Sequence, residues 1–115
     1  MDELSFLGFV KETFNCGVIR HTDLRGKKVK RIAFCGGAGS FLLNEAKSKG
    51  ADVFISSDFK YHEFFDAENE VIIADIGHFE SEQFTSQRIA SILTKKFPKC
   101  ALHLTEVNTN PINYF

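Results

Sequence analysis

The most informative stretch of this sequence spans residues 72–82 and reads Ile72-Ile73-Ala74-Asp75-Ile76-Gly77-His78-Phe79-Glu80-Ser81-Glu82. Its apolar first part is typical of a buried strand. A glycine, a histidine and an acidic cluster follow where that strand ends. In open α/β sheets, ligands and substrates bind at the carboxyl ends of the strands. The stretch therefore predicts both a buried strand and a candidate site at its end.

His78 and Glu82 are four residues apart. A helix that begins near Phe79 would place both side chains on one face, where they can reach a common ion. Imidazole and carboxylate together suit zinc, manganese, iron or nickel better than calcium. The same spacing also occurs in capping pairs and in solvated helix pairs, so the motif alone is weak. A metal site needs three or four protein ligands, and this segment supplies two of them.

Strand and helix patterns alternate along the whole chain. Strand patterns lie at residues 18–20, 29–34, 52–55, 71–76 and 101–107, and helical patterns lie at 2–14, 41–49, 59–67 and 79–97. This alternation predicts an α/β fold, with a mainly parallel sheet of about four or five strands and helices on its faces, joined by right-handed crossovers. The length of 115 residues fits a single domain over residues 1–115.

The charge of the chain is nearly balanced, at -1. Nucleic acid and anionic membranes are therefore not expected as partners. No apolar run approaches the roughly 20 residues that a membrane span needs. The start lacks a signal-peptide pattern, and the three cysteines form no paired motif, so we expect reduced thiols and a cytoplasmic location. One basic cluster could be a phosphate or nuclear-import patch. Its position at the start of a predicted strand favours a solvated edge that discourages wrong strand pairing. The cluster comprises Arg25, Lys27, Lys28, Lys30 and Arg31.

Three glycines stand between a predicted strand and a predicted helix. At Gly36, Gly37 and Gly39, backbone N–H groups could face an anion, and the helix dipole would assist. The spacing matches neither the dinucleotide fingerprint nor a Walker loop. A tight turn with close packing between strand and helix is an equal alternative to a phosphate cradle.

Asp58 and His62 form a second pair of an acid and an imidazole four residues apart. Taken singly, the aspartate is more often a helix N-cap and the histidine an ordinary surface residue. Both, however, follow a predicted strand. Because parallel strands end at the same sheet edge, we expect this pair, the glycines and the pair at residues 78 and 82 to lie at one edge.

Four motifs stand in order along most of the chain. They are Ile32-Ala33-Phe34-Cys35-Gly36-Gly37-Ala38-Gly39-Ser40, Asp58-Phe59-Lys60-Tyr61-His62, Asp75-Ile76-Gly77-His78-Phe79-Glu80-Ser81-Glu82 and Asn108-Thr109-Asn110-Pro111. Together they resemble the carboxy-terminal half of the NIF-three-like proteins of the YbgI and YqfO type, which are often labelled GTP cyclohydrolase I type 2 homologs.

The resemblance implies that the chain is one half of a NIF-three-like fold and a carboxy-terminal fragment of a longer protein. Family members hold two divalent metal ions per subunit in a cleft between two similar α/β halves, and they assemble as toroidal hexamers. By resemblance, His78 and Glu82 correspond to the metal ligands of this half. The remaining ligands belong to an amino-terminal half that nothing in this sequence matches.

The resemblance and the ligand types together predict a divalent-metal-dependent hydrolase with an unknown small-molecule substrate, GTP cyclohydrolase-like activity being one option. His78 and Glu82 would bind metal, and Asp58 and His62 would be catalytic by orienting water or substrate. Residues 36–39 would lie against an anionic group. The alternative is a non-catalytic scaffold or regulatory interaction module that holds metal ions or a nucleotide.

Overall fold

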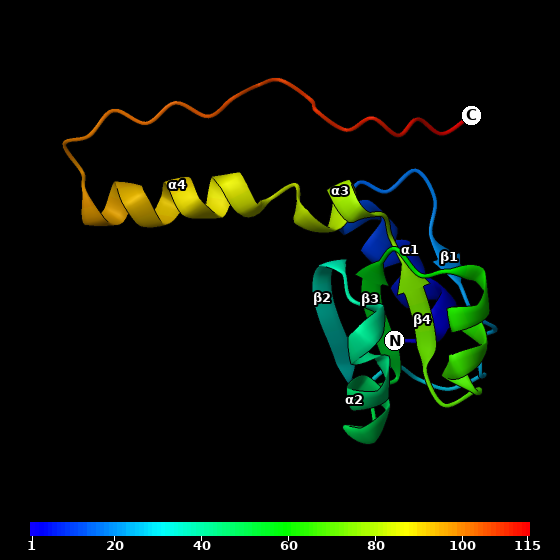
Figure 1. Ribbon diagram of the computed structural model, residues 1–115. Helices are drawn as coiled ribbons and strands as arrows, with labels where there is room; N and C mark the ends of the chain where they lie inside the picture. Colours follow the sequence, from blue (N-terminus) through cyan, green and yellow to red (C-terminus); the bar gives the residue numbers. More distant parts are fainter.

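The computed structural model describes residues 1–115 and contains a four-stranded sheet in the order β1-β4-β3-β2 (Figure 1). Three strands run parallel, and the short first strand runs antiparallel to β4. The strands are β1 (Arg20–His21), β2 (Ile32–Ala38), β3 (Val53–Ser57) and β4 (Ile72–Asp75). The chain thus has a mixed α/β fold with a mostly parallel sheet.

The register of the sheet brings the carboxyl ends of its parallel strands together. Ser57 at the end of β3 pairs with Ala38 at the end of β2. Its neighbour Ser56 pairs with Asp75 at the end of β4. Every residue of β3 is buried, as expected for the central strand of a sheet covered on both faces. Polar groups that follow these strands therefore emerge at one edge.

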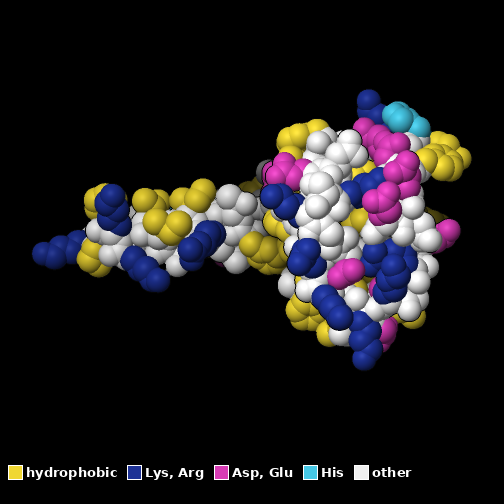
Figure 2. All heavy atoms as spheres, turned by 90° about the horizontal axis from the view of Figure 1, so that it is seen from below, with side chains coloured by type: hydrophobic (Ala, Val, Ile, Leu, Met, Phe, Trp, Pro, Cys, Tyr) yellow, Lys and Arg dark blue, Asp and Glu magenta, His cyan; other side chains and the backbone are white.

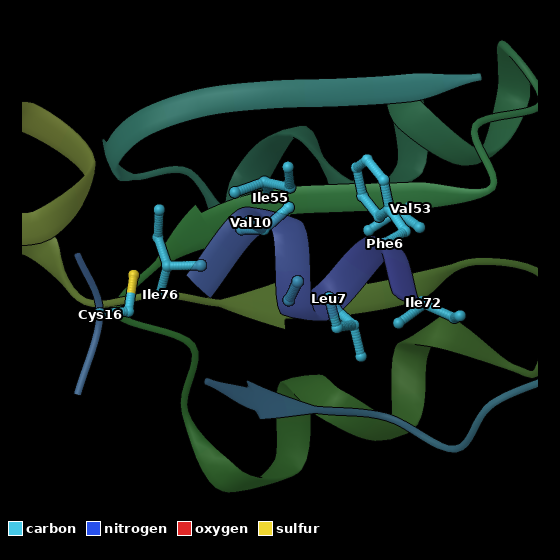
Figure 3. Packing of buried hydrophobic residues seen from close by; sticks show 9 residues of the cluster. Phe6, Leu7, Val10, Cys16, Val53, Ile55, Ile72 and Ile76 are labelled. Atoms are coloured by element: carbon cyan, nitrogen blue, oxygen red, sulfur yellow. The ribbon is translucent and has the colours of Figure 1, made fainter. Parts of the chain in front are cut away.

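Helix α1 (Glu3–Thr13) covers one face of the sheet. Asp2 caps its start, because the side chain accepts a hydrogen bond from the Ser5 N–H at 2.8 Å. The buried side of α1 packs on apolar side chains of β3 and β4, and full burial of each large one contributes about 1.5–3 kcal/mol. Figure 3 shows this cluster, with Phe6, Leu7, Val10, Cys16, Val53, Ile55, Ile72 and Ile76 labelled.

The other face carries shorter elements, namely η1 (Ser40–Leu42), α2 (Leu43–Ser48) and η2 (Tyr61–Ala67). They enclose a second cluster in which Phe54 of β3 meets the Phe59 ring edge-on, with 5.9 Å between ring centroids. The helix predicted at residues 59–67 is the 3-10 helix η2, which begins at Tyr61. All three cysteines are free thiols, and only the first, at position 16, is buried.

The predicted single helix over residues 79–97 was wrong. The structure has α3 (His78–Glu82) and α4 (Thr85–Lys96), separated at Gln83 and Phe84. The Gln83 amide donates to the Phe14 carbonyl oxygen at 2.6 Å, and the Phe84 ring packs near the Phe14 ring at 6.2 Å between centroids. These contacts with the end of α1 break the helix, and helical periodicity does not report them.

The predicted strand at residues 101–107 was also wrong, because this segment pairs with no strand. Helix α4 projects away from the sheet, and residues 97–115 return alongside it toward the body (Figure 1). The radius of gyration is 16.2 Å, whereas a compact chain of this length would have about 13 Å. Residues 101–107 therefore belong to the projecting part of the molecule, beside α4 and away from the sheet (Figure 1).

Helix α4 has no buried residue. Its apolar side chains, including Ile89, Ile92 and Leu93, are exposed. Figure 2 shows hydrophobic side chains beside Lys and Arg side chains along the projecting arm. The arm thus carries an apolar face without a partner. No helix in the structure combines the length and apolar character that crossing a membrane would require.

The interpretation of the whole basic cluster as a solvated edge was wrong for Arg25. Its side chain is buried and pairs with buried Glu3 at 3.3 Å and with Asp52 at 3.1 Å. The Glu3 carboxylate also accepts the backbone N–H groups of Arg25 and Gly26. Arg25 therefore ties the loop before β2 to the start of α1, and a pattern of charges alone does not distinguish such a residue from its solvated neighbours.

Candidate functional site

The predicted site residues Asp58, His78 and Glu82 lie together at the carboxyl edge of the sheet. The Nδ1 atom of His78 is 2.6 Å from Asp58 Oδ2, and its Nε2 atom is 3.2 Å from Glu82 Oε2. Asp58 follows β3, whereas the other two residues are the first and last of α3. Two successive strands therefore contribute to one cluster, as their shared edge requires.

This cluster is open to solvent. The side chains of His78, Glu82 and Asp58 are 46%, 50% and 51% exposed. The hydrogen bond with Asp58 raises the pKa of His78 above its ordinary value, and the charge of Glu82 acts in the same direction. Asp58 also adopts a left-handed backbone at φ 59°, a conformation that aspartate tolerates better than most residues.

Gly37 lies against this cluster, on the side of β2. It has φ 68°, and a Cβ atom placed there would lie 2.6 Å from Glu82 Oε1 and 3.2 Å from His78 Nε2. The absence of a side chain at Gly37 thus leaves room for the two candidate ligands. Of the two roles considered for the glycines, close packing is the one that these contacts support.

Gly36 and Gly37 belong to β2 and not to a turn, because the strand continues to Ala38. The ladder with β3 is irregular between Phe34 and Ala38. The Gly37 N–H donates to Ser81 Oγ at 2.8 Å, so it is not free for an anion. At Gly39, a Cβ atom would collide with the buried Ser56 hydroxyl and lie 2.9 Å from Cys35 Cβ.

Three serines that the sequence analysis did not assign hold this edge in place. Ser81 of α3 accepts from Gly37 and donates to the His78 carbonyl oxygen at 2.8 Å. Ser56 and Ser57 are fully buried and donate to the Gly37 carbonyl oxygen. The only sequence signal for them was their position next to the strand ends.

Asp75 at the end of β4 is a structural anchor. Its buried carboxylate pairs with Arg20 and accepts the backbone N–H groups of Phe59 and Gly77, each at 3.1 Å. These bonds fix the loop after β3 and the residue that precedes His78. Asp75 therefore positions both segments that carry the candidate site.

His62 is not part of the cluster. It lies exposed on η2 and has no side-chain hydrogen bond or ion pair. A surface hollow of about 890 Å³ also lies elsewhere, between residues 20–24 and η2, where Arg20, Tyr61 and Phe64 contribute to its lining. Neither the hollow nor His62 reaches the open edge occupied by His78.

The donor set fits part of a metal site. No group of three or more His, Cys, Asp or Glu residues in the chain is arranged to hold an ion. However, Nδ1 of the His78 ring contacts the Asp58 carboxylate, and Nε2 faces Glu82. A metal-binding histidine commonly gives its second nitrogen to a carboxylate in this way. His78 and Glu82 could thus hold an ion, with Asp58 behind the ring.

The fold and the site define a class of protein: mixed α/β domains that carry a histidine and carboxylates at the carboxyl edge of the sheet. The chain belongs to the Duf34/NIF3 (NGG1p interacting factor 3) family, whose model matches residues 1–111. A relative from Campylobacter jejuni, named GTP cyclohydrolase 1 type 2 homolog, is 40% identical over 108 residues. A relative of the same name from Staphylococcus epidermidis is 31% identical over 122 residues.

Solved structures share the fold. A Staphylococcus aureus protein, SA1388, matches all of this chain with a TM-score of 0.84 and 27% identity, and a Bacillus cereus protein related to NIF3 does so with a TM-score of 0.81 and 28% identity. The chain covers 39% and 33% of those two structures. The match with the Campylobacter relative spans 93% of this chain and 42% of the relative. The match with the Staphylococcus epidermidis relative spans 99% of this chain and 32% of the relative. The chain thus spans less than half the length of these relatives.

Proposed function

We propose that this chain is the metal-binding half of a divalent-metal-dependent hydrolase, and that residues outside the chain complete a dinuclear site. The observation that carries the proposal is the position of His78, whose Nε2 atom is 3.2 Å from Glu82 Oε2 while Asp58 engages Nδ1. Imidazole and carboxylate suit zinc, manganese, iron or nickel. When bound, such ions supply Lewis-acid activation of water.

The geometry supports different roles for the two residues predicted to be catalytic. Asp58 contacts the His78 ring, so in this proposal it holds the tautomer and orientation of a metal ligand. It lies beside the ligands and could also orient a water molecule. His62 has no contact with them, and its catalytic role stays a prediction, as does an anion site at residues 36–39.

The open position of the site supports its completion by other residues. A structural metal site normally has four protein ligands and a catalytic one three, whereas this edge offers two that are about half exposed. The relatives are more than twice as long as the chain. We propose that the additional part of such a longer protein also covers the apolar face of α4. The toroidal hexamer and the cytoplasmic location stay predictions.

Zinc titration of the purified chain, followed by NMR of the histidine rings, tests the metal site. Zn²⁺ should shift the His78 ring signals with weak affinity, and dialysis should remove most of the metal, because two ligands hold an ion poorly. Glu82→Gln should weaken this binding at least about tenfold, and His78→Ala should abolish it. His103→Ala is the matched control, since that exposed histidine lies in the tail.

Zinc binding that persists in His78→Ala would refute the proposed site. Turnover is tested on the full-length Campylobacter relative, using a panel of phosphoesters, nucleotides and cyclic amides with and without chelator. The proposal expects hydrolysis that chelation abolishes. Metal binding without any metal-dependent hydrolysis would refute the proposed hydrolase activity and favour the non-catalytic scaffold.

A further inference from the structure

The carboxyl-terminal tail returns to the body of the domain at Tyr114. Figure 1 shows residues 97–115 running back beside α4, with the chain end near the segment between α1 and β1. The Tyr114 ring lies against Gly17, where a Cβ atom would be 3.0 Å from ring atom Cδ2 and 3.5 Å from Cγ. The last residue, Phe115, is fully exposed. Of the two terminal aromatics, Tyr114 makes the contact.

The Tyr114 hydroxyl faces the start of α3. A Cβ atom at Gly77, the residue before the helix, would be 3.2 Å from this hydroxyl and would collide with a Glu80 carboxylate oxygen. Glu80 is buried. Partial burial and the neighbouring charge of Glu80 raise the pKa of Tyr114. The phenol is therefore neutral at ordinary pH and available as a hydrogen-bond donor to the Glu80 carboxylate.

The opposite side of α3 is seated on β2. Ser81 follows Glu80 and accepts the Gly37 N–H at 2.8 Å, while its own N–H donates to the Gly77 carbonyl oxygen at 3.0 Å. A five-residue helix has too few internal hydrogen bonds to hold itself together. Its position therefore depends on the contacts around it, which include β2 on one side and Tyr114 on the other.

We propose that Tyr114 ties the carboxyl-terminal tail to α3, so that docking of the tail and seating of the His78–Glu82 helix on β2 are one coupled event. Tyr114 is a positioning residue in this view and touches no ligand. The hydrogen bonds within the tail are local, between residues two or three apart, and do not attach it to the body. The consequence for metal binding rests on the function proposed above.

Amide hydrogen exchange by NMR on the full chain tests this coupling. In Tyr114→Ala, the Gly37 and Ser81 amides should exchange at least about tenfold faster, while the Ile55 amide in the central strand should stay within about twofold of the wild type. Phe115→Ala is the matched control, a neighbouring aromatic in the same tail that should change none of these amides. Tyr114→Phe keeps the ring and loses the hydroxyl, so it should give an intermediate acceleration.

Unchanged exchange at Gly37 and Ser81 in Tyr114→Ala would overturn the proposal, and so would an equal acceleration at Ile55, which would indicate general loss of stability. Wild-type exchange in Tyr114→Phe would remove the hydroxyl and Glu80 from the coupling. In the zinc titration, Tyr114→Ala should weaken the response of the His78 ring about threefold or more. If exchange responds as expected but the wild type shows no zinc response, the proposed function fails and the tether stands.

Discussion

Substitution of Gly37 by alanine should destabilise the domain, because the structure uses both its backbone conformation and its missing side chain. A left-handed backbone, here φ 68°, costs a residue with a Cβ atom about 1–2 kcal/mol. The new Cβ atom would lie 2.6 Å from Glu82 Oε1. That carboxylate is half exposed and can swing away at little cost, so the total loss should be about 1–2 kcal/mol.

Thermal unfolding followed by circular dichroism measures this loss. At about 4 °C per kcal/mol for a domain of this size, Tm should fall by about 4–8 °C. Gly8→Ala is the matched control with the opposite sign. Gly8 lies in α1 with no atom within 4 Å of an added Cβ, and removing a glycine from a helix interior should stabilise by about 0.5–1 kcal/mol.

A Gly37→Ala protein as stable as the wild type would refute the expected cost of the left-handed backbone at this position. The substitution also tests the alternative role of the glycines. The backbone cost applies to both roles. An anion cradle predicts in addition that the methyl group weakens binding of an anion such as phosphate, whereas close packing predicts no effect on anion binding.

Two further predictions concern the acidic residues at the strand ends. Asp75→Asn should lower the free energy of unfolding in urea by about 2–3 kcal/mol. The buried carboxylate loses its ion pair with Arg20, and the asparagine amide replaces its hydrogen bonds poorly. A change within 0.5 kcal/mol, about the effect of a surface substitution, would show that Asp75 is not the anchor. Asp58→Asn should lower the pKa of His78 in an NMR titration, since the hydrogen bond that raises it is lost. A raised folded pKa gives stability that is complete below the ordinary value of 6.5 and is lost as the pH rises through the folded pKa. The difference in free energy of unfolding between the wild type and Asp58→Asn should therefore shrink as the pH rises. An unchanged His78 pKa in Asp58→Asn would contradict the contact between Asp58 and His78.

The alternation of apolar strands and helical patterns was enough to predict the layered α/β fold and the shared edge of its strands. The edge followed from a general rule, since parallel strands joined by crossovers all end on the same side. Asp58 and His78 accordingly lie 2.6 Å apart although 20 residues separate them. Their spacing in sequence would not have predicted this contact without the sheet between them.

Features that depend on contacts between distant segments could not be predicted. The break at Gln83 comes from a hydrogen bond to Phe14, which lies 69 residues earlier. The apolar alternation at 101–107 is a genuine strand pattern, but a strand also needs an edge to pair with. The glycines at 36–39 carried a signal for special backbone, and only the neighbouring side chains distinguish packing from anion binding.

The projecting helix α4 has a consequence for the cooperativity of folding. A helix of 12 residues is marginal in water when nothing packs against it, and α4 buries no side chain of its own. The body up to Glu82 has two apolar clusters and should unfold as a unit, whereas the arm should melt earlier and gradually. A surface that covered the apolar side of α4 would join the two transitions into one. The arm would then make the folding of the body depend on whatever covers it.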